Sequence, residues 1–248
     1  MPVSPAAREQ WEASFADAIA EGAYNTAPVE AVVRMVAYYL RRHVPRERVG
    51  SLKFLETGCG AGPNLVWLAQ KGIEVSGVDI SSTALSLARR QLSRSGCEAR
   101  IGTLIESSAA SVPFPDGAFD GVIEACVFQH LPKAEREAAF AEVRRLLRPG
   151  GLFVGYLLDV GHTVFQAKQA EQLAEDPGSL RLADGRSRTQ LENLGLCHFY
   201  RQEELQELLR GFSVVDPCLA TYALPREEAK RRGYETYLQS MWVVYAIR

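Results

Sequence analysis

The 248-residue sequence lacks the features that mark several specialised classes of protein. Its 5 cysteines are widely spaced and form no C-x-x-C pair, so neither a disulfide framework nor a zinc site is expected. No apolar run approaches the roughly 20 residues that span a bilayer, and residues 1–10 lack the apolar segment of a secretory signal. These absences predict a soluble protein of the reducing cytoplasm with no membrane partner.

An excess of one charge is also missing. The formal net charge is -2 at pH 7, so no basic field attracts nucleic acid, and we expect no nucleic-acid partner. What is present is an ordinary globular composition, 47% hydrophobic and 23% charged. The length suits one large α/β domain with additions.

The hydrophobic periodicity changes along the chain. Apolar residues recur at helical spacing through residues 1–50, with a break at residues 22–28. From Leu52 to Leu157, short apolar runs alternate with longer amphipathic ones. This alternation predicts a Rossmann-like, doubly wound, mostly parallel seven-stranded sheet. The expected strands are 52–55, 74–78, 99–105, 119–123, 152–157, 212–215 and 241–247.

The same pattern suggests how the chain is organised. We expect residues 1–50 to form an N-terminal helical cap and residues 51–248 to form the main domain. Residues 159–200 break the rhythm, are polar, and fit an insertion or lid after the fifth strand.

The most informative segment is a glycine-rich loop directly after the first predicted strand. Gly58, Gly60 and Gly62 precede a predicted helix, whose N-terminus offers unpaired N–H groups to a ligand. A dinucleotide fingerprint, G-x-G-x-x-G, would place its third glycine at position 63, which is Pro63. Glu56, at the end of the strand, repels a pyrophosphate but suits a cationic ammonium.

A second acid, Asp79, ends the next predicted strand. It follows Glu56 by about 20 residues, the spacing at which an acid reaches a ribose from the neighbouring strand. Asp79 can accept hydrogen bonds from both ribose hydroxyls, and Ile80 can pack on an adenine. Ser81 or Ser82 then caps the next helix. A turn or cap acid without a ligand is the alternative, and the glycine loop in register counts against it.

Four segments resemble the motifs of one enzyme family. Residues 56–62 (ETGCGAG) resemble motif I of class I S-adenosylmethionine-dependent methyltransferases, and residues 78–81 (VDIS) resemble their second acidic motif. Residues 112–120 (VPFPDGAFD) and 147–153 (LRPGGLF) resemble the segments that lead into the fourth and fifth strands. The motifs follow the family order over about residues 50–157. The resemblance implies S-adenosyl-L-methionine as the cofactor.

The resemblance also assigns cofactor-binding residues. It implies that Glu56 and the glycine loop hold the methionine end and that Asp79 holds the ribose. Where relatives carry Asp-Ala for the adenine, this chain has Ser108-Ala109, and Glu106 is a competing candidate. The full expected set is Glu56, Gly58, Cys59, Gly60, Gly62, Asp79, Ile80, Ser108, Ala109, Glu124 and Tyr24, the last closing over the cofactor.

By analogy with the family, the end of the fourth strand lies beside the sulfonium. Glu124 is an acid that attracts a substrate cation or takes a proton there, or else an ordinary polar strand-end residue. His130 is a candidate general base, since its unperturbed pKa lies near neutrality, or else a helix cap. Displacement needs mainly proximity and alignment. No metal is expected, because His162 and His198 lack a neighbouring ligand pattern.

These features predict a methyltransferase of secondary metabolism that acts on a small-molecule O or N acceptor, as a monomer or homodimer. Three alternatives remain open. One is non-methylating chemistry, such as cyclisation or aminopropyl transfer that yields methylthioadenosine. A nicotinamide-dependent oxidoreductase is disfavoured by Pro63 and Glu56, and a silent cofactor-binding subunit is the third. The acceptor pocket is expected from the N-terminal helices, residues 159–198 and the final region, with Tyr156 facing it.

Overall fold

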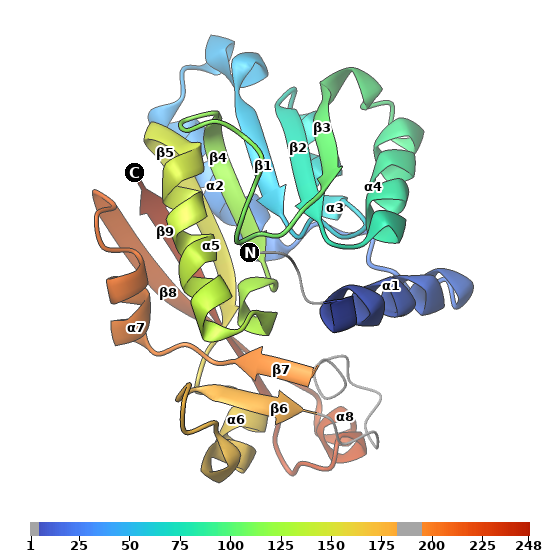
Figure 1. The fold of residues 1–248 in the computed structure, drawn as a ribbon, viewed down its shortest axis with the longest axis vertical. Helices are drawn as coiled ribbons and strands as arrows, with labels where there is room; N and C mark the ends of the chain where they lie inside the picture. The colour runs from blue at the N-terminus through green and yellow to red at the C-terminus, as the bar shows by residue number, and fades with distance from the viewer. Residues whose placement is uncertain (1–4, 183–194) are drawn as a thin grey trace.

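A seven-stranded sheet forms the centre of the protein in a computed structural model that describes residues 5–182 and 195–248 (Figure 1). The strand order is β3-β2-β1-β4-β5-β9-β8. Five strands pair in parallel: β1 (Lys53–Thr57), β2 (Glu74–Asp79), β3 (Ile101–Glu106), β4 (Phe119–Ala125) and β5 (Leu147–Leu158). The last two are antiparallel to their neighbours: β9 (Leu238–Ile247) pairs with β5, and β8 (Val214–Ala223) pairs with β9. The predicted Rossmann-like sheet is confirmed.

Helices cover both faces of the sheet (Figure 1). One layer contains α2 (Glu30–His43), α3 (Pro63–Gln70) and α4 (Ser82–Arg94), and the other contains α5 (Lys133–Leu146) and α7 (Gln202–Leu208). Successive strands are added on one side of β1 as far as β3 and on its other side from β4 onward, so the strand order reverses between β1 and β4. Ligands of such folds bind at the carboxyl ends of the strands beside that reversal.

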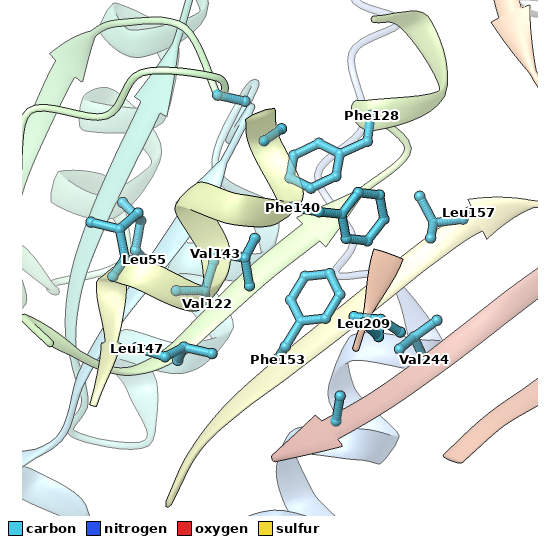
Figure 2. Packing of buried hydrophobic residues seen from close by; sticks show 14 of the residues in the cluster. Leu55, Val122, Phe128, Phe140, Val143, Leu147, Phe153, Leu157, Leu209 and Val244 are labelled. Carbon is cyan, nitrogen blue, oxygen red and sulfur yellow. The ribbon is translucent and has the colours of Figure 1, made fainter. Parts of the chain in front are cut away.

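Two apolar cores lie between the sheet and these layers. Figure 2 shows the core under α5, where Phe128, Phe140 and Phe153 pack together. The rings of Phe128 and Phe140 meet edge to face, with centroids 5.1 Å apart. The opposite core contains Phe54 and Leu65 under α2 and α3. The central strands β1 and β4 are buried along nearly their whole length, although Glu56, Asp120 and Glu124 interrupt their apolar runs.

The predicted insertion after β5 contains secondary structure of its own. It begins with α6 (Thr163–Lys168), and β6 (Ser179–Leu182) pairs antiparallel with β7 (Gly195–His198). The insertion has a small apolar core of its own, which includes Phe165 of α6. The helix α8 (Arg226–Arg231), between β8 and β9, contributes Ala229 to this core. Residues 183–194 of the predicted insertion lie outside the described residues. The boundaries proposed for the cap, the main domain and the insertion stay a prediction.

The last two strands are longer than the sequence suggests. The strand β8 runs on to Ala223, well past the expected residues 212–215, and β9 begins at Leu238 rather than Met241. Asp216 and Pro217 interrupt the apolar pattern of β8. An edge strand tolerates both, because one side of its backbone needs no partner strand.

A buried polar network fastens the insertion to α5 and α7. Arg136 of α5 is 1% exposed and donates to both carboxylate oxygens of Asp176, at 2.7 and 3.2 Å. The Ser179 hydroxyl lies 2.5 Å from Asp176 Oδ2 and 2.8 Å from His198 Nδ1. The other ring nitrogen of His198 lies 2.9 Å from Glu204 Oε2 on α7. His198 therefore serves this network, remote from the glycine loop.

Arg136→Met is expected to lower the free energy of unfolding by about 3–5 kcal/mol, because it leaves the Asp176 carboxylate buried without its cation. Urea denaturation followed by circular dichroism measures the change. Arg144→Met is the matched control, since Arg144 lies exposed on the same helix, and it should alter stability by no more than about 0.5 kcal/mol. Equal stability of the two variants would contradict the assignment.

Candidate functional site

The loop between β1 and α3 is tied to the neighbouring strand. The backbone N–H groups of Gly58 and Cys59 both donate to the Val78 carbonyl oxygen, at 2.7 and 3.0 Å. Gly62 has φ 79° and directly precedes α3, and a Cβ there would lie 2.9 Å from the Cβ of Ala88. Position 62 therefore requires glycine both for its backbone angle and for the close packing of α3 on α4.

Glu56 is buried at the end of β1 with one carboxylate oxygen unsatisfied. Its side chain is 2% exposed. Oε1 accepts a hydrogen bond of 2.6 Å from Asn64 Nδ2, whereas Oε2 is buried and has no hydrogen-bond partner among the described residues. Burial raises the pKa of Glu56 to about 8 against the lowering effect of Asn64, and Asp79 and Glu124 add to the rise. A buried acceptor without a donor is costly, so this oxygen fits a ligand ammonium.

Asp79 lies at the end of β2, next to the glycine loop. Oδ2 accepts from the Gly60 N–H at 2.8 Å, and Oδ1 accepts from the Ser81 N–H at 3.0 Å. Burial raises the pKa of Asp79, and these two N–H groups oppose that rise. Each carboxylate oxygen keeps a lone pair for a ribose hydroxyl. Of the two candidate caps, Ser81 caps α4, because its Oγ accepts from Ala84 N at 3.0 Å.

The helix α1 (Pro5–Ala20) lies across the carboxyl ends of these strands and beside α4 (Figure 1). The Phe15 ring approaches the glycine loop to 3.3 Å from where a Cβ on Gly60 would lie. Glu12 Oε1 accepts from the backbone N–H of Ser82 at 2.6 Å and from its hydroxyl at 3.0 Å, at the N-terminus of α4. Hydrogen bonds to Thr83 and Ser82 lower the pKa of Glu12 to about 2. No residue of α1 is buried, so a few contacts hold the helix over the loop.

The residues considered for an adenine lie at the end of β3 and just after it. Ser108 is buried, and its Oγ accepts from Ala110 N at 3.1 Å. Glu106 forms an ion pair with Arg8 of α1 at the surface. Glu106 pairs with Asp79 at the end of β3, and Ser108 follows two residues later. The choice between Ser108 and Glu106 stays a prediction. Tyr24 lies half-buried in the segment between α1 and α2.

Glu124 holds the turn that follows β4. Its side chain is fully buried, and Oε1 accepts from the N–H groups of Val127 and Phe128 at 2.6 and 3.0 Å. Oε2 accepts from Tyr156 N at 3.3 Å. Burial raises the pKa of Glu124 to about 7 against these three donors. The turn includes Cys126, which at φ 63° is the one non-glycine residue with a positive φ in the described ranges.

His130 follows the same turn, half-buried beneath α1. Its Nδ1 lies 3.0 Å from the Leu196 carbonyl oxygen. A carbonyl only accepts, so Nδ1 carries the proton and Nε2 is bare, 3.4 Å from Gln129 Nε2. The Trp11 ring packs edge-on against His130 with centroids 5.4 Å apart. Burial lowers the pKa of His130 to about 4, so the ring is neutral at pH 7.

Tyr156, Tyr222 and Glu30 form a polar aromatic group near Cys126 of the β4 turn, which sequence reasoning found only in part. Tyr156 is half-buried near the end of β5, and burial is the main cause that raises its pKa, followed by Cys126, Tyr222 and Glu30. The Tyr222 hydroxyl donates to Glu30 Oε2 at 3.1 Å, which links β8 to the first residue of α2. Tyr156 was expected at this crevice, whereas Glu30 and Tyr222 carry no sequence motif.

Residues 5–182 and 195–248 contain no group of three or more His, Cys, Asp and Glu side chains arranged to hold a metal ion. None of the helices in these ranges is long and apolar enough to cross a bilayer.

Comparison with known proteins identifies the family. Residues 55–155 match the family described as "Methyltransferase domain". They form a class I S-adenosylmethionine-dependent methyltransferase domain. The demethylmenaquinone methyltransferase of Thermus thermophilus is 38% identical over 104 residues, 41% of this chain and 45% of that protein. The enzyme of the same name from Symbiobacterium thermophilum is 32% identical over 162 residues, 62% of this chain and 61% of its own.

A solved structure shares the fold over the whole chain. The 1,6-didemethyltoxoflavin-N1-methyltransferase of Burkholderia thailandensis, solved with 1,6-didemethyltoxoflavin and S-adenosylhomocysteine, has a TM-score of 0.59 and 16% identity, and covers 100% of this chain and 92% of that one. The family resemblance of the motifs is confirmed, and with it S-adenosylmethionine as the cofactor of the methyltransferase domain. The match spans less than half the length of the Thermus relative, at 45%.

Glu56→Gln should change stability in a pH-dependent way in the absence of ligand. The folded-state pKa of Glu56, about 8, lies above the ordinary value of 4.5, so the protonated form is favoured in the fold. The stabilisation of the fold by protonated Glu56 is fully present below the ordinary pKa and is lost as the pH rises through 8. The variant should therefore gain stability relative to the native protein between pH 5 and pH 8.5.

Thermal unfolding at pH 5, 6.5 and 8.5 measures this difference. Glu21→Gln, at an exposed position, should show the same stability difference at every pH. A Glu56→Gln difference that stays constant with pH would show that the carboxyl group is not strongly perturbed.

Proposed function

We propose that this protein is an S-adenosylmethionine-dependent methyltransferase that acts on a small-molecule O or N acceptor by direct displacement. The observation that carries the proposal is the buried, unpartnered oxygen of Glu56. It lies at the carboxyl end of β1, where the chain reverses across the sheet, and the second acid Asp79 lies on the adjoining strand.

The residues around this oxygen suit the cofactor in order. Glu56 Oε2 would take the ammonium, the backbone of residues 58–62 would line the methionine end, and Asp79 would take the ribose. Ile80, Ser108 and Ala109 would border the adenine, and Tyr24 would cover it. When bound, S-adenosylmethionine supplies an electrophilic methyl group on a sulfonium.

We assign different roles to the two proposed catalytic residues, Glu124 and His130. Glu124 fixes the turn after β4 through three backbone N–H groups, and so positions the residues that face the acceptor. His130 carries no proton on Nε2, so this atom would take an acceptor proton once it gives up the 3.4 Å hydrogen bond from the Gln129 amide. Because its pKa is about 4, it is a weak base, and alignment of the acceptor then contributes more to the rate than proton removal.

The acceptor side favours a small molecule. The polar aromatic group of Tyr156, Tyr222 and Glu30, near Cys126 of the β4 turn, offers aromatic faces and hydrogen-bonding groups. The net charge of -2 gives no attraction to nucleic acid. The named acceptors of the similar proteins, demethylmenaquinone and 1,6-didemethyltoxoflavin, are small molecules and support the same class.

The direct test is incubation of the purified protein with S-adenosylmethionine and a panel of phenols, alcohols and amines, with products resolved by mass spectrometry. Methylated acceptor and S-adenosylhomocysteine in equal amounts are expected. Methylthioadenosine would instead indicate cyclisation or aminopropyl transfer. An unchanged cofactor with every acceptor, together with no binding of S-adenosylhomocysteine, would refute the proposal.

Asp79→Ala should weaken the binding of S-adenosylhomocysteine by about 1–3 kcal/mol, since hydrogen bonds to a charged acceptor are lost. Isothermal titration calorimetry at pH 7.5 measures the effect. Asp216→Ala provides the control, because Asp216 is exposed on the edge strand β8. Unchanged affinity in Asp79→Ala would remove the ribose role.

A further inference from the structure

Asn64 is the second residue of α3 and lies between two segments that are far apart in the sequence. Its side chain is 2% exposed. Nδ2 donates to Glu56 Oε1 at 2.6 Å, and Oδ1 accepts from the backbone N–H of Val29 at 2.8 Å. One amide therefore joins the acid at the end of β1 to the residue that precedes α2.

The chemistry of the partners fixes the orientation of this amide. The Val29 N–H only donates, so it requires the amide oxygen, and the amide NH2 must then face Glu56. The carboxylate is held by Oε1, and its other oxygen, Oε2, is left buried and unsatisfied. The direction of the free oxygen is thus set by Asn64, not by a partner on β1 itself.

We infer that Asn64 is a positioning residue: it aims the free oxygen of Glu56 at the cofactor ammonium and couples the filling of that site to the start of α2. The inference rests on the proposed function. It adds that the start of α2, which carries Glu30 and its contact with Tyr222, responds to the amino-acid end of the cofactor and not to the nucleoside.

Asn64 also affects the ionisation of Glu56. The carboxyl groups that face Glu56 are Asp79 from β2 and Glu124 from β4, and both oppose its ionisation. Among the described residues, the Asn64 N–H is the one side-chain donor that stabilises the ionised form of Glu56. Removing it should make Glu56 harder to ionise, so a cationic group loses its partner while the ribose site stays intact.

The test compares two ligands on two variants by calorimetry at pH 7.5. S-adenosylhomocysteine carries the ammonium, and methylthioadenosine lacks the whole amino-acid end. Asn64→Leu replaces the amide by an apolar group of similar size. It should weaken the binding of S-adenosylhomocysteine by about tenfold or more and leave the affinity for methylthioadenosine within about twofold of that of the native protein. An equal loss for both ligands, or no loss for either, would overturn the inference.

Asn64→Asp keeps the acceptor for Val29 and, while it holds a proton, also a donor for Glu56. It should bind S-adenosylhomocysteine within about threefold of the native protein at pH 6.5 and lose affinity at pH 8.5, when that proton is released. A loss that does not change with pH would contradict the donor role. This variant also serves if Asn64→Leu does not fold.

Hydrogen exchange supplies a readout that does not depend on affinity. At saturation, S-adenosylhomocysteine should slow exchange in peptides that contain Val29 in the native protein, and methylthioadenosine should not. Asn64→Leu should abolish this difference. If both ligands protect Val29 equally, the coupling is wrong, whereas absence of binding by the native protein would refute the proposed function itself.

Discussion

Two backbone N–H groups, those of Gly58 and Cys59, donate to one carbonyl oxygen at Val78, and this shared contact turns the chain at the end of β1 onto the end of β2. Because of it, Glu56 and Asp79 face the same space although they lie on different strands. It also sets the start of α3, and with it the side chain of Asn64. The loop depends on positive φ at three glycines, a conformation that other residues rarely adopt.

Much of the fold follows from local pattern. The central strands are short and centred on apolar residues, and the amphipathic helices between them leave few alternatives to a parallel sheet. The extent of β8 did not follow, because an edge strand that carries Asp216 and Pro217 has no apolar signature. The insertion resisted prediction for a different reason. Its core draws Phe165, Phe199 and Tyr237 from separate stretches, so no single stretch shows a periodicity that indicates their packing.

The residues of the candidate site also fall into those that local sequence pattern predicts and those that it does not. Glu56, Asp79 and the glycines could be predicted because a tight turn, a strand end and their spacing leave marks in the sequence. Asn64 could not, since its role depends on Val29, 35 residues earlier in the chain and adjacent only in the fold. The hydrogen bonds of Glu124 to three backbone N–H groups could not be predicted either, because the sequence does not distinguish such a carboxylate from one that faces a substrate.

The first helix, α1, buries none of its residues, and the contacts that hold it over the glycine loop include those of the charged side chains Glu12 and Arg8, beside the rings of Trp11 and Phe15. At physiological ionic strength charges are screened over about 8 Å, so added salt weakens the contacts of the charged side chains. The hydrogen bonds of Glu56 and Asn64 are buried and are screened far less. Ionic strength should therefore tune how readily the glycine loop is uncovered while the sheet beneath it keeps its stability.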